Sequence, residues 1–267
     1  MGRLTYLAAI AAAAAGVALG SALADLGASP TGAAADWISG IREERRAPAA
    51  AEADPARAWA ERMAAGGYIL HVRHAQREKW DTVKAFDALE IAGGLRGEEA
   101  SFRRAVCLTP RGEEEARAIG AVFAQAGVAV SAVISSPSCR ARQTAELAFG
   151  RIDRLETALL YRTMTPQAQR RGLSDRLRAT LLAMTPPPGG NIVLSGHGAT
   201  IGLDDVVDVD ETAAGVDSRE ETGVAVLEVV DGRLIARHVF ERIDVLATAV
   251  IATPLDAPAP APGPADD

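Results

Sequence analysis

The segment YILHVRHA, from Tyr68 to Ala75, decides the fold expected for this chain. Its first five residues have the length and composition of a buried strand. Arg73 and His74 follow that strand directly. In parallel α/β sheets, ligand-binding groups gather at the carboxyl ends of the strands. We therefore expect this segment to be a central strand that carries part of a functional site.

Two further segments repeat this arrangement of a strand followed by polar residues. AVIS, from Ala132 to Ser135, leads through a second serine and a proline to Arg140. NIVLS, from Asn191 to Ser195, leads into a Gly-His-Gly sequence around His197. A single histidine after a strand is more often structural than catalytic. Polar groups at three strand ends favour one shared site instead.

Helical patterns alternate with these strands. The segment from Thr109 to Gly127 has an N-cap threonine, a proline at the first helical position and an apolar stripe. Further helices are predicted over residues 55–65, 140–149 and 166–184, and a terminal hairpin over 224–230 and 234–240, joined through Asp231 and Gly232. The alternation predicts an α/β fold, a three-layer α/β/α sandwich with a mostly parallel central sheet.

The two ends of the chain differ from its middle. After Arg3, residues 4–24 carry no charge and end in Ala-Leu-Ala, the layout of a secretory signal. An uncleaved membrane anchor is the alternative, although Ala and Gly gain little from lipid. We expect an exported protein with a signal peptide or anchor at 1–24, a linker at 25–54, one catalytic domain at 55–253 and a disordered Pro/Ala-rich tail at 254–267.

Charge and cysteine content limit the partners. Lys and Arg total 28 against 35 Asp and Glu, a net charge of -7, so we expect no nucleic-acid partner. Membrane contact is expected only through an uncleaved N-terminal segment. Outside the cytoplasm, Cys107 and Cys139 can form a disulfide, and two buried thiols are the alternative.

The residue types at the three strand ends suit phosphoryl transfer. Arg73 and Arg140 offer forked, permanently charged donors for a phosphate group. An imidazole whose other nitrogen is held by a backbone carbonyl can attack phosphorus and become a phosphohistidine. A second histidine can donate to the phosphoryl oxygens as charge develops. Because these cations already neutralise a phosphate, we expect neither a metal nor a cofactor.

Four motifs, in this order, resemble the histidine phosphatase superfamily, branch 1, which has the phosphoglycerate mutase-like fold. They are RHA at 73–75, CLTPRG at 107–112, SSPSCRARQTAE at 135–146 and SGHGA at 195–199. The resemblance extends over about residues 68–240. It implies His74 as the phosphorylated nucleophile, Arg73 and Arg140 as phosphate ligands, and His197 as the second histidine.

The resemblance also implies a general acid at Glu156, in the loop after the strand that follows the SSP helix. A surface glutamate is the alternative, because the Gly- and Trp-containing sequence that follows this residue in mutases is absent. Asp81 and Asp87 are rival acids. Arg142 is expected to be a solvated helix charge, and His71 a packed strand residue.

The stretch from Gln76 to Ala105 is longer than a simple strand-to-helix connection. We expect a lid or a small helical insertion that shapes substrate choice. Its aromatic residues Trp80, Phe86 and Phe102 can instead form a satellite core. In the fold implied by the resemblance, a disulfide between the two cysteines would brace the loop of Arg140.

These features lead to a functional expectation. We expect a phosphatase that hydrolyses phosphomonoesters through a phosphohistidine on His74, in the cell envelope. The substrate is expected to be a small-molecule phosphate ester. A resemblance to exported lipopolysaccharide core heptose phosphate phosphatases suggests an envelope sugar phosphate. The alternatives are a phosphohistidine protein phosphatase and a non-catalytic envelope protein that binds anions on the same fold.

Overall fold

The computed structural model describes residues 50–79, 83–92, 100–160, 170–198, 207–209, 213, 216 and 219–251. The predicted signal segment, most of the predicted linker and the predicted C-terminal tail lie outside these ranges, as do Trp80 and Asp81. Within the described ranges, no helix has the length and apolar character needed to cross a membrane. The same ranges contain no group of three or more His, Cys, Asp or Glu able to hold a metal ion.

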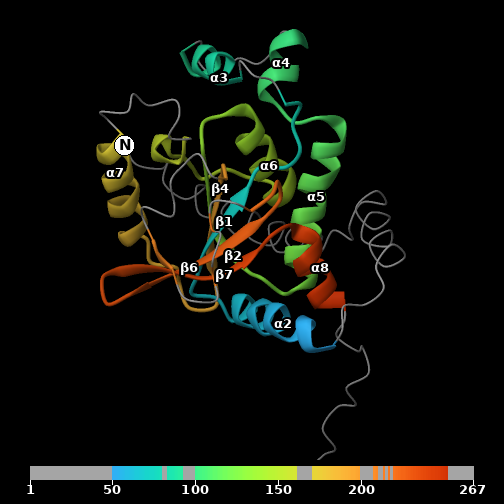
Figure 1. Cartoon of the computed structure of the whole chain (residues 1–267), viewed down its shortest axis with the longest axis vertical. Helices are drawn as coiled ribbons and strands as arrows, with labels where there is room; N and C mark the ends of the chain where they lie inside the picture. Colours follow the sequence, from blue (N-terminus) through green and yellow to red (C-terminus); the bar gives the residue numbers. More distant parts are fainter. Residues whose placement is uncertain are drawn as a thin grey trace, which may run out of the picture.

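The described strands form one central sheet, with the order β3-β2-β4-β1-β6-β7-β5 (Figure 1). Strands β3, β2, β4 and β1 run parallel to one another, whereas β6 pairs antiparallel with both β1 and β7. The last strand, β5, is parallel to β7. The sheet is therefore mostly parallel, as predicted. Its strands are β1 (Ile69–Arg73), β2 (Val130–Ser135), β3 (Arg154–Leu155), β4 (Asn191–Gly196), β5 (Asp208–Val209), β6 (Val224–Val230) and β7 (Arg233–Phe240).

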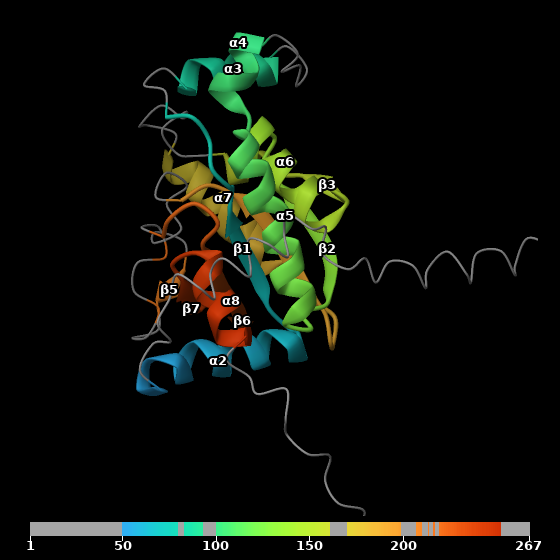
Figure 2. The same cartoon turned by 90° about the vertical axis from the view of Figure 1, so that its right-hand side faces the viewer.

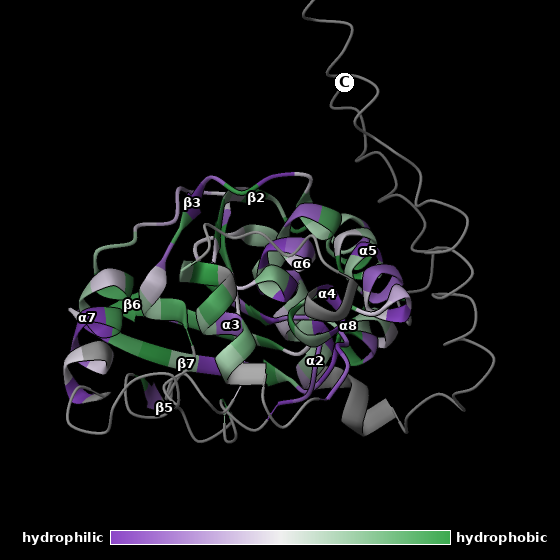
Figure 3. Ribbon diagram, turned by 90° about the horizontal axis from the view of Figure 1, so that it is seen from above, coloured by the Kyte–Doolittle hydropathy of each residue, from purple (hydrophilic) through white to green (hydrophobic). Residues whose placement is uncertain are grey.

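Helices cover both faces of the sheet, as the view from above shows (Figure 3). One face packs against α2 (Ala50–Ala65), α5 (Pro110–Gln125), α6 (Cys139–Phe149) and α8 (Ile243–Ile251). The other face packs against α7 (Arg170–Leu182) and the short 3-10 helix η1 (Thr157–Leu159). Alternate residues of β4 serve the two faces, since Val193 joins the first cluster and Leu194 the second. The fold is the predicted three-layer α/β/α sandwich.

Local sequence signals explain two of these elements. The Thr109 hydroxyl accepts a hydrogen bond from the amide of Gly112 at 3.0 Å, and Pro110 opens α5, as the N-cap pattern predicts. The β6–β7 hairpin turns at Asp231 and Gly232, whose φ angles of 50° and 73° are both left-handed. This combination gives the backbone twist that a two-residue hairpin needs.

Helix α2 begins at Ala50, whereas the sequence pattern predicted a helix from Pro55. Five residues of the predicted linker are therefore helical. The reason is local, because the segment AAEAD is rich in alanine, the residue with the highest helix propensity.

The insertion between β1 and α5 contains two helices, α3 (Val83–Ala92) and α4 (Ala100–Val106). They project together from one end of the domain (Figures 1 and 2). Phe86 packs against a small cluster formed by Ala105, Val106, Cys107 and Cys139. The prediction of a helical insertion with its own satellite core is thus confirmed for Phe86, while the side chain of Phe102 lies outside the described residues.

Candidate active site

His74 lies at the carboxyl end of β1, between the ends of β4 and β6. Its amide donates a hydrogen bond to the Gly196 carbonyl at 2.9 Å, and its own carbonyl accepts one from Thr222 at 3.3 Å. The next amide, that of Ala75, donates to the hydroxyl of Thr144 on α6. The backbone around His74 is therefore fixed by three different segments, and the ring is only 4% exposed.

The hydrogen bonds of the His74 ring define its tautomer. Nδ1 lies 2.8 Å from the Ala75 carbonyl oxygen, which can only accept, so Nδ1 carries the hydrogen. Nε2 then keeps its lone pair. Burial, and next the guanidinium of Arg140, hold the pKa of His74 well below its usual value of 6.5. At neutral pH the ring is uncharged and Nε2 is available as a nucleophile.

His197 follows β4, and its ring meets the His74 ring edge to face, with centroids 5.3 Å apart. Its Nδ1 lies 3.5 Å from Nη2 of Arg140, which only donates, so Nδ1 is the acceptor. Its Nε2–H then donates to the hydroxyls of Ser136 at 3.1 Å and Ser138 at 3.3 Å. Burial and the positive charge of Arg140 keep the pKa of His197 low as well.

Ser136 and Ser138 were not among the site residues predicted from the sequence. Their signal was the SSPS sequence itself, which places several hydroxyls between a strand and a helix start. The two hydroxyls fix the orientation of the second histidine, which is a positioning role.

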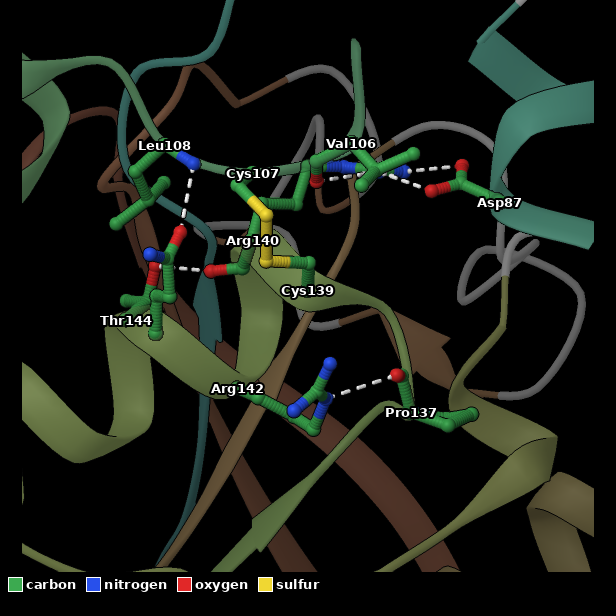
Figure 4. The surroundings of a disulfide bond; sticks show 10 residues. Asp87, Val106, Cys107, Leu108, Pro137, Cys139, Arg140, Arg142 and Thr144 are labelled. Atoms are coloured by element: carbon green, nitrogen blue, oxygen red, sulfur yellow. Dashed lines mark hydrogen bonds and ion pairs between the residues drawn. A yellow bond between two sulfur atoms is a disulfide. The ribbon is translucent and has the colours of Figure 1, made fainter. Parts of the chain in front are cut away.

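Arg140 occupies the first turn of α6 and is almost completely buried. Both of its terminal nitrogens bind the carboxylate of Asp87 on α3, Nη1 at 2.7 Å and Nη2 at 3.0 Å (Figure 4). Nη1 also lies 3.5 Å from the Val106 carbonyl. Asp87, expected as a rival acid, thus reaches the site, where its carboxylate accepts hydrogen bonds from both terminal nitrogens of Arg140.

Arg73 is the last residue of β1, and its Nη1 donates a hydrogen bond to the Arg219 carbonyl. Its guanidinium packs against Gly198, where an added Cβ would lie 2.9 Å from Nη1 and 3.0 Å from Cζ. Because Gly198 directly follows His197, Arg73 lies beside the second histidine. The structure therefore brings Arg73, His74, Arg140 and His197 together, while their catalytic roles stay predictions.

Glu156 lies just before η1 and acts as its N-cap. Its carboxylate accepts a hydrogen bond from the Ala158 amide at 2.9 Å and lies 3.9 Å from Nη2 of Arg154. The Glu156 amide donates to the carbonyl of Ser135 at the end of β2. In the part of the chain that the structure describes, these contacts join Glu156 to its own loop and to β2. They do not connect Glu156 to either site histidine, so its role as a general acid stays a prediction.

Glu221, which was not predicted as a site residue, lies in the turn that contacts the His74 backbone. The neighbouring residue Thr222 has a φ of 70° and donates its amide to the His74 carbonyl. Burial raises the pKa of Glu221, while the charges of Arg73 and Arg77 act in the opposite direction. No motif marked this loop in the sequence.

His71 and Arg142 were both placed outside the site by the sequence. His71 is a fully buried strand residue, as interpreted, and its Nδ1 contacts Nη2 of the buried Arg219. The expectation of a solvated charge at Arg142 is wrong. Its side chain is half-buried and its Nε donates to the Pro137 carbonyl at 3.1 Å, because that carbonyl, just before α6, lies within reach of the side chain (Figure 4).

The two cysteines, left open by the sequence, form a disulfide between Cys107 and Cys139, with their Cα atoms 4.9 Å apart. Figure 4 shows this bond beside the Arg140 side chain. It connects the end of the insertion to the residue that precedes Arg140. The segment that follows the insertion is therefore covalently linked to the start of α6, the helix that carries Arg140.

Comparison with known proteins gives one family match. The family model of the histidine phosphatase superfamily (branch 1) matches residues 69–164. No curated protein sequence matches the chain significantly. Among solved structures, the chain is similar to the protein histidine phosphatase SixA complexed with tungstate, at 16% identity and a TM-score of 0.42, over 65% of this chain and 96% of that chain.

It is also similar to the phosphoserine phosphatase of Entamoeba histolytica in complex with 3-phosphoglyceric acid. That similarity has 13% identity and a TM-score of 0.40, over 67% of this chain and 98% of the other. The family match itself begins with the strand of His74 and includes the helix of Arg140. The match to the histidine phosphatase superfamily, branch 1, thus covers residues 69–164 of this chain, a segment that contains Arg73, His74 and Arg140.

Proposed function

We propose that this protein is a phosphatase that hydrolyses phosphomonoesters through a phosphohistidine on His74. One observation carries the proposal. The buried ring of His74 has its Nδ1–H held by a carbonyl and its Nε2 unprotonated, beside His197 and within the field of Arg140. This is the protonation state that a nitrogen nucleophile needs at neutral pH.

The reaction follows from these groups. The guanidinium donors orient the phosphoryl group, and Nε2 of His74 attacks phosphorus. The bond from phosphorus to the leaving oxygen breaks, and that oxygen takes a proton from a general acid. Water then attacks the phosphohistidine, the P–N bond breaks with its electron pair returning to Nε2, and the proton of water passes to the acid's carboxylate.

Glu156 is our proposed general acid, and Glu221 is the carboxyl group to compare with it. We expect Glu156→Gln to lower kcat about 10²- to 10⁴-fold for an alkyl phosphate, and much less for an aryl phosphate whose leaving group needs no proton. Glutamine can still accept the bond from the Ala158 amide, so η1 keeps its cap. A selective loss in Glu221→Gln instead would assign the proton to Glu221.

The location and substrate class are part of the proposal. We propose that the protein is exported and acts on an envelope sugar phosphate or a similar small phosphate ester. The signal-like segment at 1–24 supports export, and so does the Cys107–Cys139 disulfide, because disulfides persist mainly outside the cytoplasm. Hydrolysis rates for a panel of sugar, nucleotide and protein phosphates would test the substrate class.

A second candidate function is a phosphatase for phosphohistidine in proteins. The specific observation in its favour is that the Glu156 carboxylate caps η1. A phosphorylated nitrogen is a good leaving group that needs little help from an acid. In that case Glu156→Gln would leave hydrolysis of a phosphohistidine peptide unchanged.

The deciding experiment is hydrolysis of an aryl phosphate by the wild-type protein and by His74→Ala. We expect the variant to lose nearly all activity, and the wild type to form a phosphoprotein that is labile to acid. His238→Ala is the matched control, because that histidine packs between Trp59 and Phe240, away from the site. Equal rates for wild type and His74→Ala would refute the proposal and leave the anion-binding alternative.

A further inference from the structure

The side chain of Arg140 already holds an anion, the carboxylate of Asp87. The two groups meet in a fork-to-fork arrangement, with N–O distances of 2.7 and 3.0 Å (Figure 4). Arginine presents the same pair of parallel N–H donors to a carboxylate and to a phosphate. Asp87 therefore occupies the geometry through which Arg140 would bind a phosphoryl group.

Both side chains of this ion pair are buried. The side chains of Arg140 and Asp87 are 2% and 0% exposed. A phosphate dianion brought to the same guanidinium would meet the Asp87 charge at close range, without water to screen the repulsion. The two anions thus compete for one cation, and they compete most strongly when the incoming group carries two charges.

Asp87 comes from α3 of the insertion, and the contacts around it keep the insertion on the site. Its neighbour Phe86 packs against the cluster of Ala105, Val106, Cys107 and Cys139. The disulfide joins this cluster to the residue before Arg140. The far end of the insertion is therefore covalently fixed, whereas the Asp87 pair and the packing of Phe86, both on α3, are non-covalent and reversible.

We infer that Asp87 is an internal competitor for the phosphate group, so that a substrate has to displace its carboxylate from Arg140. This inference rests on the proposed function, since it assigns Arg140 to phosphate binding. It makes α3 a gate whose closed state is the free protein. Strongly bound dianionic phosphate esters open the gate, while weakly bound monoanions leave it closed.

The test is the affinity for inorganic phosphate, measured by calorimetry and as competitive inhibition of aryl phosphate hydrolysis. Asp87→Asn keeps the size of the side chain and one acceptor oxygen but removes the charge. We expect its Kd for phosphate to fall by at least about tenfold, because removing a like charge from a buried anion site relieves repulsion.

Glu78→Gln is the matched control. Glu78 belongs to the same insertion and also binds an arginine with both carboxylate oxygens, at 2.7 and 3.1 Å, but this pair with Arg104 is exposed. Its removal should leave the Kd for phosphate unchanged. An equal gain of affinity in both variants would point to a general charge effect and overturn the inference.

A second measurement needs no substitution, in case Asp87→Asn fails to fold. Amide hydrogen exchange of α3 in the wild-type protein is compared with and without saturating inorganic phosphate. We expect faster exchange in residues 83–92 when phosphate is bound, because the Asp87 contact is lost. Slower or unchanged exchange would mean that Asp87 stays in place, and the inference would be wrong.

The outcomes separate the inference from the proposed function. If His74 is required for hydrolysis but Asp87→Asn binds phosphate no more tightly, only the gate is refuted, and Asp87 instead holds Arg140 in position. If hydrolysis is absent but Asp87→Asn binds phosphate more tightly than wild type, the gate stands without the enzyme. Undetectable phosphate binding in both proteins overturns the inference.

Discussion

The ring of His74 loses its basicity for two reasons that act in the same direction. Burial removes the water that would solvate an imidazolium, and the Arg140 guanidinium repels the added charge. Arg140 also binds the carboxylate of Asp87, so its charge is partly balanced. Together, burial and Arg140 keep the imidazole of His74 neutral. Arg140 is also the residue that is expected to bind the phosphate group of the substrate.

This arrangement predicts the acid side of the pH profile. A base whose pKa is lowered stays unprotonated until the pH falls below that lowered value. We therefore expect kcat/KM for an aryl phosphate to stay constant as the pH falls through 6.5, the usual value for histidine, and to decline only below it. An acid limb centred at or above 6.5 would contradict the assignment of His74 as a neutral buried nucleophile.

Gly198 offers a test of the position of Arg73. An added Cβ would lie 2.9–3.0 Å from the guanidinium of Arg73, so Gly198→Ala has to push that side chain aside. We expect kcat/KM to fall about 100-fold, the cost of a displacement near 1 Å in a positioned group. The overall fold should survive, as circular dichroism would show.

Gly172→Ala is the control, because an added Cβ there meets open space on helix α7. We expect unchanged activity and a gain in stability of about 0.5–1 kcal/mol, as alanine replaces glycine inside a helix. Loss of activity in both variants would show that the effect at Gly198 is not specific to Arg73.

At the scale of the elements, a covalent bond links the end of α4 to the start of α6. The Cys107–Cys139 disulfide spans 32 residues. Replacing both cysteines by serine should lower the free energy of unfolding by about 3–4 kcal/mol in the chain-entropy account. Urea unfolding of the variant and the wild type would measure this difference in the free energy of unfolding. A reductant should destabilise the wild type alone, because the variant has no disulfide to reduce. Unchanged stability would mean that the bond does not form in solution.

Helices and turns that are marked by neighbouring residues were predictable from the sequence. Side-chain contacts between segments far apart in the sequence were not. The N-cap at Thr109 and the turn at Asp231 are set by neighbouring residues, so α5 and the hairpin followed from the sequence. The pairing of Asp87 with Arg140 joins residues 53 positions apart. No local pattern distinguishes that partner from a rival acid, because the contact exists only after the insertion has folded back on the site.

The site residues also divide into those that the sequence predicted and those that it did not. His74, Arg140 and His197 followed from polar groups at three strand ends, since parallel topology brings those ends together. The half-burial of Arg142, the turn of Glu221 and the serine contacts of His197 depend on loop conformations, which strand order does not determine.

At the scale of the whole molecule, all four histidines of the sequence have lowered pKa values. Burial is the first cause in each, and the pKa of His238 falls to about 4. Below pH 6.5, the unfolded chain therefore binds protons that the folded chain does not. Glu221 has the opposite effect on stability. Its pKa is raised in the folded state, so the folded chain binds this proton at a higher pH than the unfolded chain does.

We expect stability to be highest at neutral pH and to decline as the pH falls below 6.5, by about 1.4 kcal/mol per pH unit for each excess proton bound by the unfolded state. Urea midpoints measured from pH 7.5 to 4.5 would test this. His238→Gln should reduce the slope without touching the site. A stability that rises on acidification would show that the histidines are not buried in their neutral form.

The strands at the two margins of the sheet, β3 and β5, are only two residues long. Each margin thus offers few backbone donors and acceptors to a strand from another molecule. We therefore expect the native fold to resist intermolecular sheet growth, the first step toward amyloid-like aggregation, because its margins offer almost no template for another strand.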